Sequence, residues 1–213
     1  MISDPGFTEV KFRAVDGELR TLATCFPPLD ELPAYLGDAL AGIMRFQGYG
    51  GSYTVAQHCC LVDDLSGSKD PALRLALLLH DAAEAIVGDV PKPWKDVLPD
   101  FQRLEQCVND QLNRVVGIVG VVPGYYSGSL EKYVHRYDSL AMRLEARKLF
   151  GSGWREQFGL SSEEDVSVPP GSLDAVLRNH LLPTGMDIWK RDRAARVYAN
   201  RVEAQIQKLR TRK

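Results

Sequence analysis

The sequence predicts an all-α protein with a short β-hairpin at its N-terminus. After the first 28 residues, apolar side chains recur every three or four residues, the spacing of buried helix faces, whereas strict alternation is confined to the segment before. Hydrophobic residues make up 45% and charged residues 25% of the 213 residues, which are the proportions of a folded globular protein. We expect one domain over residues 1–213, with 1–28 as a hairpin extension, 29–150 as the core and 151–213 as a C-terminal loop and helices.

The N-terminal hairpin is predicted from an alternating pattern around one tight turn. Three apolar residues alternate with charged ones, the dipeptide Asp16-Gly17 supplies the turn, and residues 18–24 return. Pro27 and Pro28 then end any strand, because proline lacks a backbone N–H. The alternating apolar residues are Val10, Phe12 and Ala14.

The helices are predicted from apolar stripes and from residues typical of helix ends. Thr54 and Gln57 have the spacing of a capping box. Asp70 before Pro71 is a helix start, and Gly88 is expected to close that helix in the left-handed conformation. The polar segment 161–170 is expected to be a loop. The expected helices cover residues 32–44, 54–65, 70–87, 101–119, 130–149, 172–182 and 187–209.

Charge and composition exclude several classes of protein. The net charge of −2 lacks the strong positive field of a nucleic-acid binder, and no apolar run approaches the ~18 residues that cross a bilayer. The first residues do not form a secretory signal. Four cysteines without paired spacing suggest neither a zinc site nor a disulfide framework, so Cys59 and Cys60 are interpreted as core thiols in a cytoplasmic protein. The basic stretch 187–213 is interpreted as a solvated helix face or as a patch that steers anionic substrates.

Polar residues gather at the end of one apolar helix. His80 and Asp81 follow a run of leucines, where burying a charge without a partner is costly. Glu84 is expected on the same helix face, and Asp89 follows just past the glycine stop. This pattern predicts a polar pocket.

Two more residues extend this group from other helices. His58 lies near the start of the preceding helix, and Asp138 interrupts a later apolar stripe. With His80 and Asp81 they offer two neutral imidazoles and two carboxylates, which neutralise a divalent ion such as Mn, Co, Zn, Fe, Ni or Mg. A structural polar network is the alternative interpretation. The other histidines, His135 and His180, lack acidic partners at ligand spacing and are interpreted as structural.

Four features together resemble the HD-domain metal-dependent phosphohydrolases. They are the run Tyr-Thr-Val-Ala-Gln-His at 53–58, His-Asp-Ala-Ala-Glu at 80–84, Gly-Asp-Val-Pro-Lys-Pro at 88–93, and Asp138. The chain is most similar to bacterial 5′-deoxynucleotidases and to small phage HD hydrolases, including phage dATP triphosphohydrolases. The resemblance covers about residues 39–149 and implies an HD-domain helical bundle.

The resemblance also implies a role for each residue of the site. One divalent metal ion would be held by His58, His80, Asp81 and Asp138. Two acids would lie beside the reacting phosphate, namely Glu84 and Asp89. The substrate would be bound by Arg45 at its phosphate, by Phe46 in place of the family's sugar-packing tryptophan, and by Lys92 as a point charge. A structural alternative for Arg45 is an ion pair with Glu84 or Asp89.

The expected activity is the hydrolysis of phosphate from small deoxynucleotides by an activated water. The substrate is either a 5′-monophosphate or a triphosphate such as dATP, and a more cationic pocket, with Lys95 or arginines of the C-terminal helix, would favour the triphosphate. A hydrolase of cyclic nucleotides or alarmones, or a non-catalytic metal-dependent nucleotide-binding module, are the alternatives. We expect a homo-oligomer with no membrane partner and no stable nucleic-acid partner, in the host cytoplasm if a phage encodes it.

Overall fold

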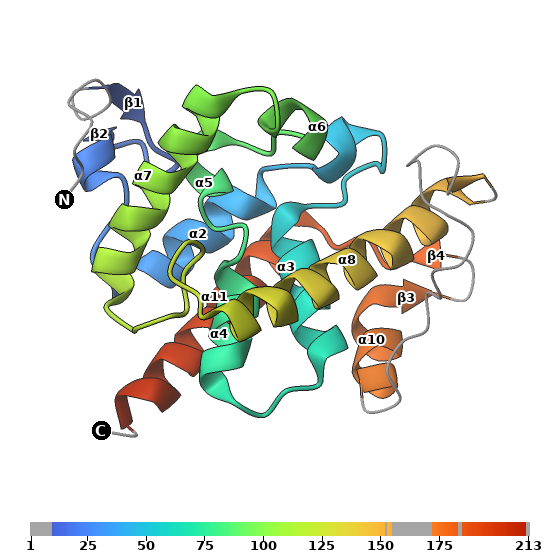
Figure 1. Ribbon diagram of the computed structural model, residues 1–213. Coiled ribbons are helices and arrows are strands. Elements are labelled where there is room, and N and C mark those ends of the chain that lie inside the picture. The colour runs from blue at the N-terminus through green and yellow to red at the C-terminus, as the bar shows by residue number, and fades with distance from the viewer. Residues whose placement is uncertain (1–9, 152, 155–171, 183–184, 212–213) are drawn as a thin grey trace.

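The computed structural model describes residues 10–151, 153–154, 172–182 and 185–211. Within these residues the protein is mostly helical, with one two-stranded antiparallel sheet near the N-terminus and a second, very short one near the C-terminus (Figure 1). The expectation of an all-α protein with an N-terminal hairpin is therefore confirmed in its coarse form. The second sheet was not expected.

The N-terminal hairpin forms as predicted. Strand β1 (Lys11–Arg13) pairs antiparallel with β2 (Leu19–Thr21), so that Phe12 lies opposite Arg20. Gly17 has a φ of 83°, which the turn requires and glycine adopts without strain. Arg20 also donates to the carboxylate of Asp16 at 2.6 Å and fastens the turn to the second strand. A short 3-10 helix, η1 (Leu22–Thr24), leads from the hairpin into the core.

Helices α2 (Leu32–Ala41) and α3 (Val55–Ser66) flank a short irregular segment that contains η2 (Arg45–Gly48). The predicted helix to Met44 was wrong at its end, because Gly42 caps α2 and Met44 instead pairs in extended conformation with Thr54. Thr54 caps α3 by accepting from the Gln57 N–H, as predicted. The reciprocal half of the capping box is not formed: the Gln57 side chain bonds the backbone of residues 187 and 189 instead.

The predicted helix over 70–87 was wrong in the middle. Asp70 does cap α4 (Pro71–Leu79), but the chain turns after Leu79 and resumes as α5 (Glu84–Val87). Tight bonds from Ala82 N–H to Leu79 O and from Glu84 N–H to Asp81 O replace the α-helical pattern. Gly88 has a positive φ of 79° but an extended ψ of 167°, so it does not close a helix in the left-handed conformation.

The middle of the chain forms α6 (Lys92–Lys95), α7 (Pro99–Val116) and α8 (Gly128–Phe150). Gly117 ends α7 in the left-handed conformation, so Val119, predicted to share the buried stripe, lies beyond the helix and is 97% exposed. Gly151 ends α8 as expected. Helix α8 lies across α3 and α4 on the face shown in Figure 1.

The C-terminal part contains α10 (Leu173–His180), β3 (Leu181–Leu182), β4 (Gly185–Met186) and α11 (Arg191–Thr211). The loop predicted over 161–170 lies outside the described residues. Helix α11 packs against α2, α3 and α4, and a Cβ on Gly37 of α2 would lie 2.5 Å from the Ala195 carbonyl oxygen of α11. Cys59 and Cys60 are fully buried, as predicted. Among the described helices we find none with the length and apolar character that a membrane span requires.

Candidate metal centre

Three side chains converge at the point where α4 ends beside α3. His58, His80 and Asp81 each offer one ligand atom, and these atoms lie within 4.8 Å of one another. The two imidazole Nε2 atoms are 3.2 Å apart, and Asp81 Oδ2 lies 3.2 Å from His80 Nε2 and 3.6 Å from His58 Nε2. These residues therefore form a group that could hold a metal ion.

Asp138 of α8 adds a fourth ligand atom to this group, its second oxygen. Its Oδ1 lies 3.2 Å from His58 Nε2 and 3.8 Å from His80 Nε2. Two atoms that bind one ion at about 2.1 Å stand about 3.0–3.5 Å apart at octahedral or tetrahedral angles. The observed separations, between 3.2 and 3.8 Å, are close to that range. The structure thus brings together the four residues that the sequence singled out.

Hydrogen bonds on the far side of each imidazole fix which nitrogen faces the group. His80 Nδ1 lies 2.7 Å from the Leu77 carbonyl oxygen, which only accepts, so Nδ1 carries the proton. His58 Nδ1 lies 2.5 Å from the Glu145 carboxylate. Both Nε2 lone pairs are therefore directed into the group, the arrangement that metal-binding histidines have. Two such lone pairs 3.2 Å apart repel each other unless a cation lies between them.

A wholly buried carboxylate joins this group to the predicted phosphate-binding arginine. Glu145 is 0% exposed, accepts from Tyr53 Oη at 2.9 Å and forms an ion pair with Arg45, whose Nε lies 3.3 Å from Oε2. Arg45 Nη1 also lies 3.4 Å from Asp81 Oδ2. The alternative prediction, that Arg45 forms an ion pair with Glu84 or Asp89, was wrong. The guanidinium pairs with Asp81 and Glu145 instead.

Charges within the centre shift several pKa values. Burial disfavours the charged forms of both histidines, but neighbouring carboxylates outweigh it, so the pKa values of His58 and His80 are raised. Burial likewise opposes ionisation of Asp81 and Asp138, yet the two imidazoles hold both pKa values well below the ordinary range. The side chains thus form a site with an excess of negative charge that attracts positive charge, whether a proton or a metal ion.

The two predicted catalytic acids lie beside the group, in α5 and in the segment after it. Glu84 is 5% exposed, and burial together with the charges of Asp81 and Asp89 raises its pKa well above the usual value. Burial also raises the pKa of Asp89, with Asp81 acting in the same direction. Lys95 Nζ lies 3.7 Å from Glu84 Oε1 but 2.7 Å from Glu105, so it is already paired. Glu84 therefore holds a proton more strongly than an exposed glutamate does.

The segment that carries Arg45 has an unusual backbone. Phe46 and Gln47 both have a φ of 54°, and within the described residues they are the non-glycine residues with positive φ. Such conformations cost about 1–2 kcal/mol each. The Phe46 ring packs edge-on against Phe150, and the Arg45 guanidinium lies 5.4 Å from the centre of the Phe46 ring. Packing therefore holds the aromatic ring beside the arginine, where the sequence placed it.

Comparisons with known proteins give two relatives, and no family model matches the chain. The uncharacterized protein YfdR of Escherichia coli (strain K12) is 31% identical over 136 residues, which are 62% of this chain and 70% of YfdR. An uncharacterized protein of Rhodobacter capsulatus is 29% identical over 132 residues, 58% of this chain and 65% of that protein.

The chain belongs to the YfdR family. Neither relative's name states an activity, and the residues of the site are what bears on the function of this YfdR-family protein. The chain spans just under two thirds of the Rhodobacter capsulatus relative.

Sequence reasoning missed some residues around the centre of this YfdR-family chain. Glu145 was not singled out from the sequence, although it stands two helical turns after Asp138 and therefore on the same face. His135, interpreted as structural, is exposed and lines a cavity beside the group. The side chain of Lys92, predicted to bind substrate, lies outside the described part of the structure.

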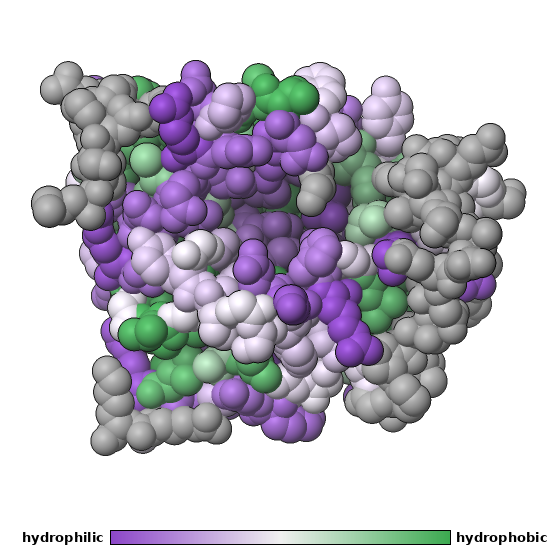
Figure 2. Space-filling model, viewed as in Figure 1, coloured by the Kyte–Doolittle hydropathy of each residue, from purple (hydrophilic) through white to green (hydrophobic). Residues whose placement is uncertain are grey.

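Hydrophilic residues surround a hollow near the centre of the molecular face shown in Figure 2.

Proposed function

We propose that this YfdR-family chain is an HD-domain phosphohydrolase that uses one divalent metal ion to remove phosphate from small deoxynucleotides. The observation that carries the proposal is the convergence of two imidazole Nε2 atoms and two carboxylate oxygens from α3, α8 and the turn after α4. The hydrogen bonds of the two Nδ1 atoms support it, because they orient both lone pairs inward.

The donor set fits a divalent transition metal. Two neutral imidazoles and two carboxylates carry a charge of −2, which one such ion balances, and mixed nitrogen and oxygen donors suit Mn, Co, Zn, Fe or Ni better than calcium. The ion would be held by His58, His80, Asp81 and Asp138. When bound, it supplies Lewis acidity and an activated water.

The chain's own residues would bind and orient the phosphate. Arg45 already lies 3.4 Å from Asp81, so its guanidinium stands beside the group, and no described residue accepts a hydrogen bond from its Nη2. That free edge suits a phosphate oxygen. Phe46 limits the movement of the guanidinium, since the two are in cation–π contact.

Glu84 and Asp89 would handle protons during the reaction. Glu84 Oε2 is buried and accepts no hydrogen bond within the described residues, and its raised pKa favours the protonated acid. Such a group can donate its proton to the leaving oxygen of the nucleoside, and the Asp89 carboxylate can accept the proton that the attacking water loses and pass it to Glu84. Lys95, through its contact with Glu84, would limit how far that pKa rises.

The charges favour the monophosphate over the triphosphate. Arg45 and Lys95 are both paired with carboxylates, and Arg201 of α11 pairs with Asp63 and Asp64. Within the described residues these three cations are thus neutralised, and Lys132 lines the cavity beside the centre as one further cation, whereas a triphosphate requires several free ones.

Elemental analysis and product analysis together test the proposal. With Mn²⁺ or Co²⁺ we expect the wild-type chain to release phosphate from deoxynucleoside monophosphates faster than any product from the triphosphates. The double variant His80→Ala/Asp81→Ala should lose bound metal and activity together while keeping its helical circular dichroism, and Glu203→Gln on α11 serves as the control. A wild-type chain without metal, or one that binds nucleotides tightly but releases no phosphate, would contradict the proposal.

A further inference from the structure

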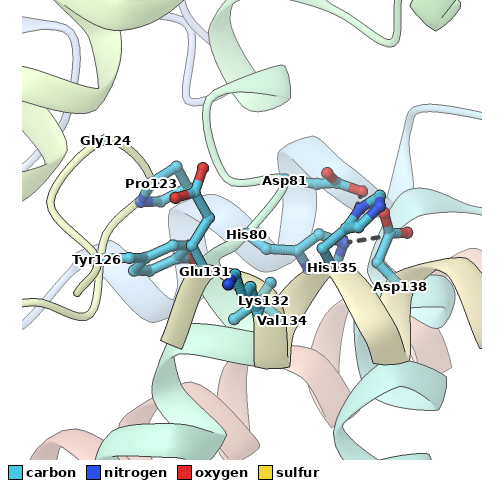
Figure 3. A pocket seen from close by; sticks show the side chains of 10 residues that line it. All are labelled: His80, Asp81, Pro123, Gly124, Tyr126, Glu131, Lys132, Val134, His135 and Asp138. Atoms are coloured by element: carbon cyan, nitrogen blue, oxygen red, sulfur yellow. Dashed lines mark ion pairs between the residues drawn. The ribbon is translucent and has the colours of Figure 1, made fainter. Parts of the chain in front are cut away.

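A cavity of about 550 Å³ adjoins the metal centre, and Arg45 is not among the residues that line it. Its volume lies within the range of small-molecule sites. Figure 3 shows the lining side chains, which come from α8, from the segment before it and from the turn after α4. The cavity shares three residues with the centre, so a molecule whose phosphate lies at the centre can extend into it. The lining consists of His80, Asp81, Pro123, Gly124, Tyr126, Glu131, Lys132, Val134, His135 and Asp138.

The cavity offers both apolar surface and free polar groups. Tyr126 and Val134 supply apolar surface, and the hydroxyl of Tyr126 donates to the Ala76 carbonyl oxygen at 3.1 Å, which fixes the ring. Glu131, Lys132 and His135 project from the first turns of α8, and no described residue forms a side-chain hydrogen bond or ion pair with them. Arg45 and Lys95, in contrast, are already paired.

We infer that this cavity binds the nucleoside half of a nucleotide whose phosphate lies at the metal centre. The inference rests on the proposed function for the position of the phosphate. Apart from Asp81 and Asp138, which belong to the metal centre, the lining has one carboxylate, Glu131, and one ammonium, Lys132. This balanced charge suits a neutral group that has both donors and acceptors. A further phosphate would instead face the carboxylate of Glu131.

Each free polar group matches part of a nucleobase. The Glu131 carboxylate accepts from the amino or imino N–H groups of a base, and the Lys132 ammonium donates to a ring nitrogen or carbonyl oxygen. Tyr126 provides a fixed aromatic wall against which a flat ring can pack. The residues that discriminate between substrates are therefore expected in α8 and in the segment before it, and not only in the loop that carries Phe46.

Binding of the four 2′-deoxynucleosides, which carry no phosphate, tests the cavity without reference to catalysis. We expect saturation-transfer NMR to show binding of at least one deoxynucleoside to the full chain as purified. The double variant Glu131→Ala/Lys132→Ala should weaken that binding at least tenfold. The matched control Glu203→Ala/Lys208→Ala removes the same charges from the exposed face of α11 and should leave binding unchanged. No binding to the wild-type chain, or equal binding to the α8 variant, would overturn the inference.

A kinetic comparison separates this inference from the proposed function. With Mn²⁺ present, the α8 variant should raise the KM for deoxynucleoside monophosphates about tenfold and leave hydrolysis of 2-deoxyribose 5-phosphate, which has no base, unchanged. An equal loss of activity with both substrates would count against a nucleoside site in the cavity. If deoxynucleosides bind but no phosphate is released, the proposed phosphohydrolase activity is refuted and the nucleoside site in the cavity is supported. If phosphate is released but deoxynucleosides do not bind, the activity is supported and the nucleoside site is refuted.

Discussion

Glu145 connects two functions of the candidate site through one side chain. Its Oε1 lies 2.5 Å from His58 Nδ1 and accepts from Tyr53, while its Oε2 faces Arg45. The carboxylate is fully buried, and although burial opposes its ionisation, His58 and Arg45 lower its pKa. The same negative charge therefore orients a proposed metal ligand and a proposed phosphate ligand.

Replacing Glu145 with glutamine is expected to weaken metal binding. The amide keeps the size of the side chain but removes the charge that orients His58 and strengthens it as a ligand, and such outer partners typically contribute 10- to 100-fold to affinity. Competition with a chelating dye should show a Mn²⁺ dissociation constant higher by that factor. Glu203→Gln, an exposed change of the same chemistry, should not alter it. An unchanged affinity in Glu145→Gln would show that His58 needs no such partner.

The sequence predicted the four residues of the centre but not Glu145, for a physical reason. His58, His80, Asp81 and Asp138 stand out because each interrupts an apolar pattern with a group that is costly to bury alone. Glu145 also interrupts one, but a single acid on a long amphipathic helix usually faces solvent. Its burial depends on how α8 crosses α3, which one sequence does not reveal.

At the scale of elements, the turn after α4 is where sequence reasoning failed. The apolar pattern continues through residue 87, so periodicity alone predicts one helix. The chain instead turns at His80, whose Nδ1 bonds the Leu77 carbonyl oxygen. This turn moves Glu84 into a separate short helix. The ends of α2 and α7 were misplaced for a similar reason, since glycines at 42 and 117 stop helices whose apolar residues continue.

The contact between α2 and α11 predicts the effect of one substitution. A Cβ on Gly37 would lie 2.5 Å from the Ala195 carbonyl oxygen and 3.2 Å from the Ala199 side chain. Gly37→Ala should therefore lower the free energy of unfolding by about 1–3 kcal/mol, despite the higher helix propensity of alanine. Denaturant unfolding measures this. Gly128→Ala, where no atom lies within 4 Å of the added Cβ, is the control and should not destabilise the protein.

At the scale of the whole molecule, a buried charge network fastens the C-terminal part to α3. His180 and Arg201 both bond the Asp64 carboxylate, and His180 stacks on Trp189 with ring centres 5.0 Å apart. Trp189 in turn donates its backbone N–H to Gln57, the residue before His58. The segments that follow residue 172 thereby support the helix that carries a proposed metal ligand.

His180 is expected to make stability depend on pH. Burial lowers its pKa, which the bonds to Asp64 only partly offset, while Arg201 lowers it further and Glu145 acts weakly in the opposite direction. Because the folded pKa is depressed, the unfolded chain takes up the proton first, and stability falls as pH decreases through about 6.5, the ordinary pKa of histidine. One proton contributes at most about 1.4 kcal/mol per pH unit.

Urea unfolding at several pH values, compared between the wild type and His180→Gln, measures the contribution of His180 to the pH dependence of stability. The variant should lose less stability on acidification, because it lacks the titrating imidazole but can still donate to Asp64. His58 and His80, whose raised pKa values act in the opposite direction, are present in both proteins and cancel in the comparison. Parallel curves would mean that His180 contributes nothing to the pH dependence.

A bound metal ion should raise the thermal stability of the whole molecule. An ion at one hundred times its dissociation constant stabilises the folded state by about 2.7 kcal/mol, provided that the unfolded chain does not bind it. Calorimetry with Mn²⁺ should show a higher Tm for the wild type and no change for His80→Ala/Asp81→Ala. A similar increase in both proteins would place the ion elsewhere.

The backbone at Phe46 and Gln47 has a consequence for adaptation to heat. Two consecutive side chains in the left-handed conformation leave about 2–4 kcal/mol that glycines would recover. A lineage selected only for thermal tolerance would gain from glycine at either position. Glycine would also make the loop more flexible, and Arg45 beside it would be held less firmly. Such a gain in stability is therefore compatible only with a protein that no longer has to bind its ligand through Arg45.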